Sequence, residues 1–203
     1  MWIKICGMTS AEAVAAALAA GVDALGFVFA ESVRQLTPQA AARLAAPARG
    51  RVRCVAVMRH PSQRALDEIL SVLQPDLLQT DAADFASLRL PAALARLPVV
   101  RAGEASATLP PRLLFEGPAS GTGRVVDWQA AGALARRTEL VLAGGLNAAN
   151  VARAIAAVQP FGVDVSSGVE ERPGVKSPDA IAEFVMAARA AGARPQPASE
   201  DSP

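Results

Sequence analysis

The chain has 203 residues, of which 52% are hydrophobic and 19% are charged. This composition supplies enough apolar side chains for a substantial core and argues against a disordered chain. With 20 basic and 19 acidic residues the net charge is +1, so no excess charge indicates binding to nucleic acid or to an anionic membrane.

Reactive side chains are few, with two cysteines, one histidine and no tyrosine. Two cysteines do not make a disulfide framework in a chain of this length, and a single histidine offers little from which to build a metal site. The N-terminus lacks the features of a secretory signal, and no apolar run reaches about 18 residues, the length of a membrane-spanning helix. We therefore expect a cytoplasmic protein that binds no metal.

Short runs rich in Val, Ile, Leu and Phe alternate with longer, Ala-rich runs along the chain. The short runs predict strands at Trp2–Cys6, Ala24–Phe29, Val52–Met58, Leu77–Gln79, Val99–Arg101, Leu113–Glu116, Glu139–Ala143 and Gly162–Val165. The longer runs predict helices at Ser10–Ala20, Pro38–Ala46, Ser62–Leu73, Asp84–Ala93, Asp127–Arg136, Ala148–Val158 and Pro178–Ala191. Strands that alternate with helices indicate βαβ units and a parallel sheet.

Eight such units of about 25 residues each fit a single-domain (β/α)8 TIM barrel, with an open doubly wound sheet as the alternative. The interval between Arg101 and Leu113 is short and contains Gly103 and two prolines, so we expect the fifth helix to be reduced or missing. The barrel domain should span residues 1–192, and the polar, Pro-rich tail 193–203 should be disordered.

Two turns rich in glycine and serine follow the predicted seventh and eighth strands, at Gly144–Gly145 and at Ser166, Ser167 and Gly168. Glycine lets backbone N–H groups approach an anion, and barrels commonly bind phosphate at the loops after these two strands. Each turn alone is only a turn signal. Together they predict a phosphate site.

Three further candidates end predicted strands, where the active groups of a barrel lie. Cys6 precedes a turn into a helix N-terminus that would favour a thiolate, although a buried small hydrophobe is the plainer interpretation. Glu116 is either a proton donor or acceptor or simply a cap or salt-bridge partner. Asp164 either binds a ligand or accepts hydrogen bonds from the neighbouring turn.

Other polar residues have simpler interpretations beside the functional ones. Arg34 offers two-point recognition of a carboxylate, or else is an ordinary surface arginine. His60 is expected in a solvated loop and Cys54 in the core.

Five segments resemble phosphoribosylanthranilate isomerase of tryptophan biosynthesis, in the order that this family has them. They are KICGMT (Lys4–Thr9), GFVF (Gly26–Phe29) with SVRQLTP (Ser32–Pro38), LLFEGPASGTGRVVDW (Leu113–Trp128), AGGLNAANV (Ala143–Val151) and GVDVSSGVEERPGVKSP (Gly162–Pro178). KICG and DVSSGVE with the following PGxK are specific, whereas AGGL also occurs in other phosphate-binding barrels.

The resemblance implies a (β/α)8 barrel that carries out the Amadori rearrangement of N-(5-phosphoribosyl)anthranilate without a metal or other cofactor. It implies a phosphorylated small-molecule substrate and a monomer or homodimer. By position it implies the following roles: Cys6 as general base, Glu116 as general acid, Arg34 at the anthranilate carboxylate, Gln79 at the substrate, Asp164 beside the ribose hydroxyls, and the two turns at the phosphate. A thiol has a reference pKa of about 8.5, which falls toward neutrality in an electropositive site.

Three positions depart from the family's pattern. Glu116 stands where the family usually has aspartate, and its extra methylene extends the carboxyl by roughly 1.5 Å, a shift large enough to matter for catalysis. The usual Ser-Pro-Arg is Ser32-Val33-Arg34, and the usual Gln-Leu-His-Gly is Gln79-Thr80-Asp81-Ala82. The alternatives to the isomerase are a non-catalytic phosphate-binding barrel, acting as a sensor or partner protein, and a related sugar-phosphate isomerase or epimerase.

Overall fold

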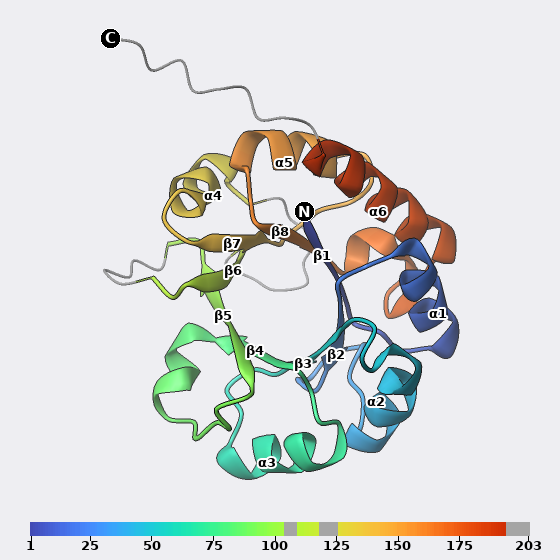
Figure 1. Cartoon of the computed structure of the whole chain (residues 1–203), viewed down its shortest axis with the longest axis vertical. Coiled ribbons are helices and arrows are strands. Elements are labelled where there is room, and N and C mark those ends of the chain that lie inside the picture. The colour runs from blue at the N-terminus through green and yellow to red at the C-terminus, as the bar shows by residue number, and fades with distance from the viewer. Residues whose placement is uncertain (104–108, 118–125, 194–203) are drawn as a thin grey trace.

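The computed structural model describes residues 1–103, 109–117 and 126–193, and these form a closed barrel. Eight parallel strands pair in chain order, and the last pairs with the first, Lys4 lying opposite Asp164. The predicted TIM barrel is confirmed, and the open doubly wound sheet is wrong, because pairing of the first and last strands leaves no free edge. Figure 1 looks into the barrel, with the α-helices arranged around its outside.

The strands are β1 (Trp2–Cys6), β2 (Ala24–Val28), β3 (Arg53–Val57), β4 (Leu77–Asp81), β5 (Ala95–Arg101), β6 (Arg112–Glu116), β7 (Glu139–Leu142) and β8 (Gly162–Val165). The α-helices in the described part are α1 (Ala11–Ala20), α2 (Pro38–Ala45), α3 (Gln63–Val72), α4 (Trp128–Ala135), α5 (Val151–Val158) and α6 (Pro178–Gly192). A short antiparallel hairpin, β9 (Glu170–Arg172) and β10 (Val175–Lys176), follows β8 and was not predicted.

Local sequence signals explain where the helices begin. The side chains of Ser10, Thr37, Ser62, Asp127 and Ser177 each accept a hydrogen bond from a backbone N–H in the first turn of the helix that follows. This is the preferred way to satisfy N–H groups that have no partner within the helix. These five helix starts were therefore readable from the sequence, whereas α5 has no such side-chain cap and begins at Val151, three residues after its predicted start.

Side chains on each strand alternate between the inside of the barrel and the helices outside. On β1, Ile3 and Ile5 join the outer core beneath the helices, whereas Trp2 packs with the inner core. The inner core includes Val55, Leu97 and Leu114 from three other strands. The same alternation places Lys4 and Cys6 on the inner side, where the site is built.

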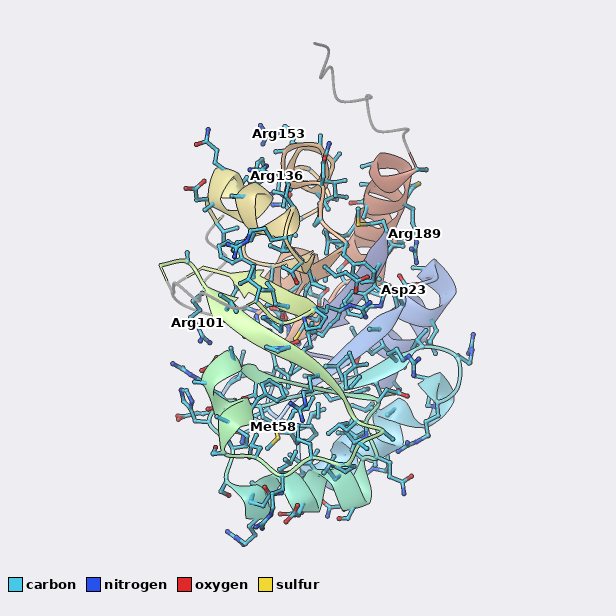
Figure 2. The ribbon with its side chains drawn as sticks, turned by 60° about the vertical axis from the view of Figure 1, so that its left-hand side comes forward. Asp23, Met58, Arg101, Arg136, Arg153 and Arg189 are labelled. Carbon is cyan, nitrogen blue, oxygen red and sulfur yellow. The ribbon has the colours of Figure 1, made fainter. Side chains whose placement is uncertain are left out.

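One ion pair ties the last helix to the start of the barrel. Arg189 of α6 lies beside Asp23, just before β2 (Figure 2), with Nη2 2.9 Å from Oδ2. The same guanidinium also donates to the backbone carbonyls of Met1 and Gly21. These contacts anchor α6 next to β1 at the seam where the barrel closes.

The helix predicted at Asp84–Ala93 is wrong. A 3₁₀ helix, Ala82–Ala86, leads instead into turns, and β5 begins earlier than predicted, at Ala95. Asp84 accepts hydrogen bonds from Thr80 on β4 and from the backbone of His60 in the loop after β3, so its side chain is not available to start a helix. Pro91 lacks the N–H that a continuing helix would need.

Two other predictions fall mainly outside the described residues. The connection from β5 to β6, where a reduced fifth helix was expected, contains residues 104–108, and the expected tail contains residues 194–203. No helix in the described part of the chain has both the length and the apolar character needed to cross a membrane.

Candidate functional site

A cavity of about 320 Å³ opens at the carboxyl ends of the barrel strands. Its walls contain all but one of the predicted site residues, namely Cys6, Arg34, Gln79, Glu116, Gly144, Gly145, Asp164, Ser166 and Ser167. Gly168 is the exception and lies behind the wall in the following 3₁₀ turn. The barrel thus brings groups from six strand ends and their loops to one place.

Cys6 lies at the end of β1, with a cation and a carboxylate next to it inside the barrel. Lys4 is 0% exposed, and its Nζ lies 2.8 Å from Oδ1 of Asp164 on β8. Burial raises the pKa of the Cys6 thiol, while the charge and hydrogen bond of Lys4 act in the opposite direction. The thiol is almost fully buried, and the pKa of Cys6 therefore lies above its ordinary value.

The floor of this arrangement is Gly26 on the neighbouring strand β2. A methyl group at this position would come within 3.0 Å of Sγ of Cys6 and 3.1 Å of Nζ of Lys4. The thiol and the ammonium therefore occupy space that the side chain of any residue other than glycine at position 26 would fill.

Arg34, in the loop after β2, grips a carboxylate of the protein itself. Its Nε and Nη2 each lie 2.7 Å from an oxygen of Glu170, and Nζ of Lys176 lies 2.7 Å from Oε1 of the same residue. Burial alone would raise the pKa of Glu170, but the hydrogen bonds from Arg34 and Lys176 hold it below its usual range. Within the protein, Arg34 therefore binds the Glu170 carboxylate at two points along one edge of its guanidinium.

The two predicted phosphate turns meet at the top of β7 and β8. A Cβ at Gly168 would lie 1.8 Å from the carbonyl oxygen of Leu146, so only glycine allows the two loops to come this close. Asn150 shapes the first loop, since its side chain accepts from the backbone N–H of Asn147 and donates to the carbonyl of Gly145. Lys176 donates to the carbonyl of Ser166 and fixes the second loop.

Glu116 ends β6 beside a chain of alternating charges. Nη2 of Arg101, at the end of β5, lies 3.1 Å from Oε1 of Glu116, and its Nη1 lies 2.5 Å from Oδ1 of Asp81 on β4. His60 then contacts Asp81 and Asp84, at 3.2 and 3.0 Å. Figure 2 shows Arg101 at its strand end. His60 is solvent-exposed, as predicted, yet its ring nitrogens contact both of these carboxylates.

His60, Asp81 and Asp84 also have the donor types of a metal site, with their ligand atoms within 4.8 Å of one another. The guanidinium of Arg101 already contacts Asp81, and its positive charge opposes a cation at this place. We therefore interpret the group as part of the ion-pair chain.

Gln79 lies on the inner side of β4 and is buried in the cavity wall. Its Oε1 has no hydrogen-bond partner among the residues described here. A buried carbonyl oxygen without a partner is costly, so this atom is suited to accept a hydrogen bond from a bound molecule or from water.

Comparison with known proteins assigns the family. The sequence model described as PRAI, N-(5'phosphoribosyl)anthranilate (PRA) isomerase, matches residues 3–187. The chain belongs to the N-(5'-phosphoribosyl)anthranilate isomerase family. Its closed eight-stranded barrel is the fold seen in the solved structures of that family.

Individual relatives match over nearly the whole length. The N-(5'-phosphoribosyl)anthranilate isomerase of Mesorhizobium japonicum is 39% identical, with 93% of this chain and 95% of that protein covered. The structure of TrpF from Jonesia denitrificans is 34% identical, covers 95% and 98% of the two chains and has a TM-score of 0.80. A phosphoribosyl anthranilate isomerase in complex with reduced 1-(o-carboxyphenylamino)-1-deoxyribulose 5-phosphate is 28% identical, covers 94% and 99%, and has a TM-score of 0.77.

Several residues of the site were not among the sequence candidates: Lys4, Asp81, Arg101, Glu170 and Lys176. A usable signal existed for the first, because a lysine within an apolar strand two residues before a strand-end cysteine must share its face. The others needed the three-dimensional arrangement, since their partners lie on other strands or loops.

Proposed function

We propose that this protein converts N-(5'-phosphoribosyl)anthranilate into 1-(o-carboxyphenylamino)-1-deoxyribulose 5-phosphate, a step of tryptophan biosynthesis. The observation that carries the proposal is one cavity, in a chain of this family, that joins a thiol, a carboxyl group and two adjoining glycine turns. One relative binds a reduced form of the proposed product.

The proposed mechanism uses one acid and one base. Glu116, as the acid, gives a proton to the ribose ring oxygen, and the ring opens to a Schiff base. Cys6, as the base, removes the proton from C2', and the resulting enolamine becomes the ketone when its C2' hydroxyl loses a proton and C1' gains one. Atoms and charge balance, because one proton is taken up at the ring oxygen and one is lost from carbon. Each transfer by a well-positioned group accelerates the reaction by roughly 10²–10⁴-fold.

The phosphate is assigned to the paired turns. Gly144, Gly145 and Ser166–Gly168 bring backbone N–H groups to the end of the barrel that barrels commonly use for phosphate. Lys176 supports this loop from behind by its bond to the Ser166 carbonyl. We assign Asp164 to the ribose hydroxyls, because it lines the cavity between Cys6 and this turn.

The anthranilate carboxylate is assigned to Arg34. Glu170 takes the Nε and Nη2 edge of its guanidinium, and Nη1 belongs to the other edge, where a substrate carboxylate can bind. The orphan Oε1 of Gln79 is assigned to a substrate N–H or hydroxyl group.

The test is fluorescence-monitored turnover of freshly prepared phosphoribosylanthranilate. Wild type should turn over, whereas Cys6→Ser and Glu116→Gln should lose at least about 10²-fold in kcat. Cys54→Ser is the matched control for the thiol, since Cys54 lies in the core away from the cavity wall, and it should retain activity.

Two outcomes would favour the other functions. A wild-type protein that binds the reduced product without turnover would be the non-catalytic phosphate-binding barrel. Turnover of a phosphorylated aldose that lacks the anthranilate ring, with none of phosphoribosylanthranilate, would make it a related sugar-phosphate isomerase. Full activity of Cys6→Ser would refute the assigned base.

A further inference from the structure

Lys4 is among the largest fully buried side chains of the described residues, and its place is unusual for a lysine. The strand register sets it opposite Asp164, with which its ammonium forms a hydrogen-bonded ion pair of 2.8 Å. Burying such a pair is expensive, and an apolar residue of similar size usually serves stability as well or better. Packing alone therefore does not account for a lysine at this position.

The ammonium of Lys4 shares its pocket with the thiol of Cys6. Both atoms lie within 3.1 Å of the empty Cβ position of Gly26, and the two side chains are within hydrogen-bonding reach of each other. Asp164 and Lys4 face Cys6 from β8 and β1, Lys176 faces it from β10, and Arg34 faces it from the loop after β2. Among the described groups that act on it, the thiol thus faces three cations and one anion.

We propose that Lys4 is a positioning residue for Cys6, whose ammonium, held in place by Asp164, is the fixed cation that stabilises the thiolate when Cys6 gives up its proton. The use of that thiolate rests on the proposed function, whereas the electrostatic relationship between the three side chains does not.

The balance of charges explains why this particular cation matters. Burial raises the pKa of Cys6, Lys4 is the strongest of the groups that lower it, Asp164 raises it, and Lys176 lowers it less. Burial would also lower the pKa of Lys4, but Asp164 and then Cys6 outweigh this and raise it, so the ammonium keeps its charge. Asp164 therefore both retains the cation and competes with the thiolate for it.

This double role predicts shifts of opposite sign. Replacing Lys4 by methionine removes the cation and should move the titration of Cys6 to higher pH. Replacing Asp164 by asparagine removes the competing anion and should move it to lower pH. A lysine that only neutralises Asp164 for the sake of folding would produce neither shift.

The experiment is a pH titration of the ultraviolet absorbance of the thiolate, with no substrate present. It uses a Cys54→Ser parent, in which Cys6 is the only thiol. The substitution removes the signal of Cys54, because burial raises the pKa of that second thiol to about 11. The sequence has no tyrosine, whose ionisation near pH 10 would otherwise overlap the signal.

In this parent, Lys4→Met should raise the midpoint by about one pH unit or more, and Asp164→Asn should lower it by a similar amount. Lys176→Met is the matched control for loss of a nearby lysine charge, and it should give the smaller upward shift. Folding is checked by circular dichroism. If Lys4→Met fails to fold, the double variant Lys4→Met/Asp164→Asn leaves no lone buried charge, and its midpoint should still rise.

Midpoints of Lys4→Met and Asp164→Asn that both coincide with the parent would overturn the proposal, as would a double variant that does not rise. The result is independent of turnover. If the parent titrates as expected but never isomerises phosphoribosylanthranilate, the proposed function fails and the Lys4 assignment stands. If turnover occurs and the midpoints do not move, the proposed function stands and the Lys4 assignment fails.

Discussion

Arg34 and Glu170 lie 136 positions apart in the chain and form a two-point ion pair, with both N–O distances at 2.7 Å. The pair joins the loop after β2 to the hairpin after β8, across the top of β1. Thr9 strengthens the same connection, because its hydroxyl donates to the carbonyl of Gly174 in the hairpin turn. A cation of the cavity wall is thereby oriented by a carboxylate before any ligand binds.

Arg34→Lys keeps the charge but loses the planar fork that holds Glu170 and, in the proposed function, the anthranilate carboxylate. Hydrogen bonds to charged groups are each worth about 1.5–3 kcal/mol, so kcat/KM should fall by roughly 10–100-fold, mostly through KM. Arg64→Lys, an exposed position on α3, is the control and should leave steady-state kinetics unchanged. An unchanged KM for Arg34→Lys would remove this residue from the substrate site.

The depressed pKa of Glu170 predicts an acid-sensitive contribution to stability. Because the folded-state pKa lies below the usual value of 4.5, this contribution is present above about pH 4.5 and is lost as the pH falls through the folded pKa. Glu170→Gln should therefore be less stable than wild type at neutral pH, and the difference should shrink toward pH 3. Chemical denaturation at a series of pH values measures this. A difference that is constant with pH would contradict it.

Gly26→Ala should damage the site more than the fold. The added methyl meets the Cys6 thiol and the Lys4 ammonium at about 3 Å, and overpacking of this kind costs typically 1–3 kcal/mol of unfolding free energy. We expect kcat to drop by at least tenfold, since the thiol must move. Gly132→Ala on α4, where the nearest atom is at 3.4 Å, is the control and should be active. Equal kinetics of the two variants would show that the space at Gly26 is not needed.

Gly168→Ala should separate the two phosphate turns. A Cβ 1.8 Å from the Leu146 carbonyl cannot be accommodated without moving one loop. Inhibition by inorganic phosphate should weaken by an order of magnitude or more, because the backbone N–H groups no longer converge. Competition assays with inorganic phosphate measure the effect. Unaltered inhibition would place the phosphate elsewhere.

Arg101→Gln should lower kcat by releasing Glu116. The guanidinium binds the carboxyl groups of Glu116 and Asp81 and so fixes the position of Glu116. Displacements of about 1 Å in a reacting group can cost about 10²-fold in rate. Arg112→Gln breaks an ion pair with Glu139 at the opposite end of β6 and is the matched control. Single-turnover rates that are the same for both variants would refute the positioning role of Arg101.

Much of the fold was predictable because its signals are local. Apolar runs of strand length, capping side chains such as Ser10 and Thr37, and the turn glycines all act within a few residues of the chain. The helix predicted from Asp84 failed because its side chain bonds to Thr80 and to His60, and the latter follows another strand. Local composition contains no information about such partners.

The site was predicted in part for the same reason. The ends of parallel strands meet on one face of a barrel, so Cys6, Gln79, Glu116 and the two turns were placed together without knowledge of distances. The roles assigned to them remain proposals to be tested by the variants above.

The sequence by itself determined the order of the eight barrel strands and of the six α-helices in the described part, the face on which reactive side chains gather, and the family. Only the tertiary structure decided that Lys4 and Asp164, 160 positions apart, are partners beside Cys6, and that Arg34 is held by Glu170. The physical reason is barrel closure. Pairing of β8 with β1 in one register brings the two ends of the chain together, and that register depends on all eight strands at once.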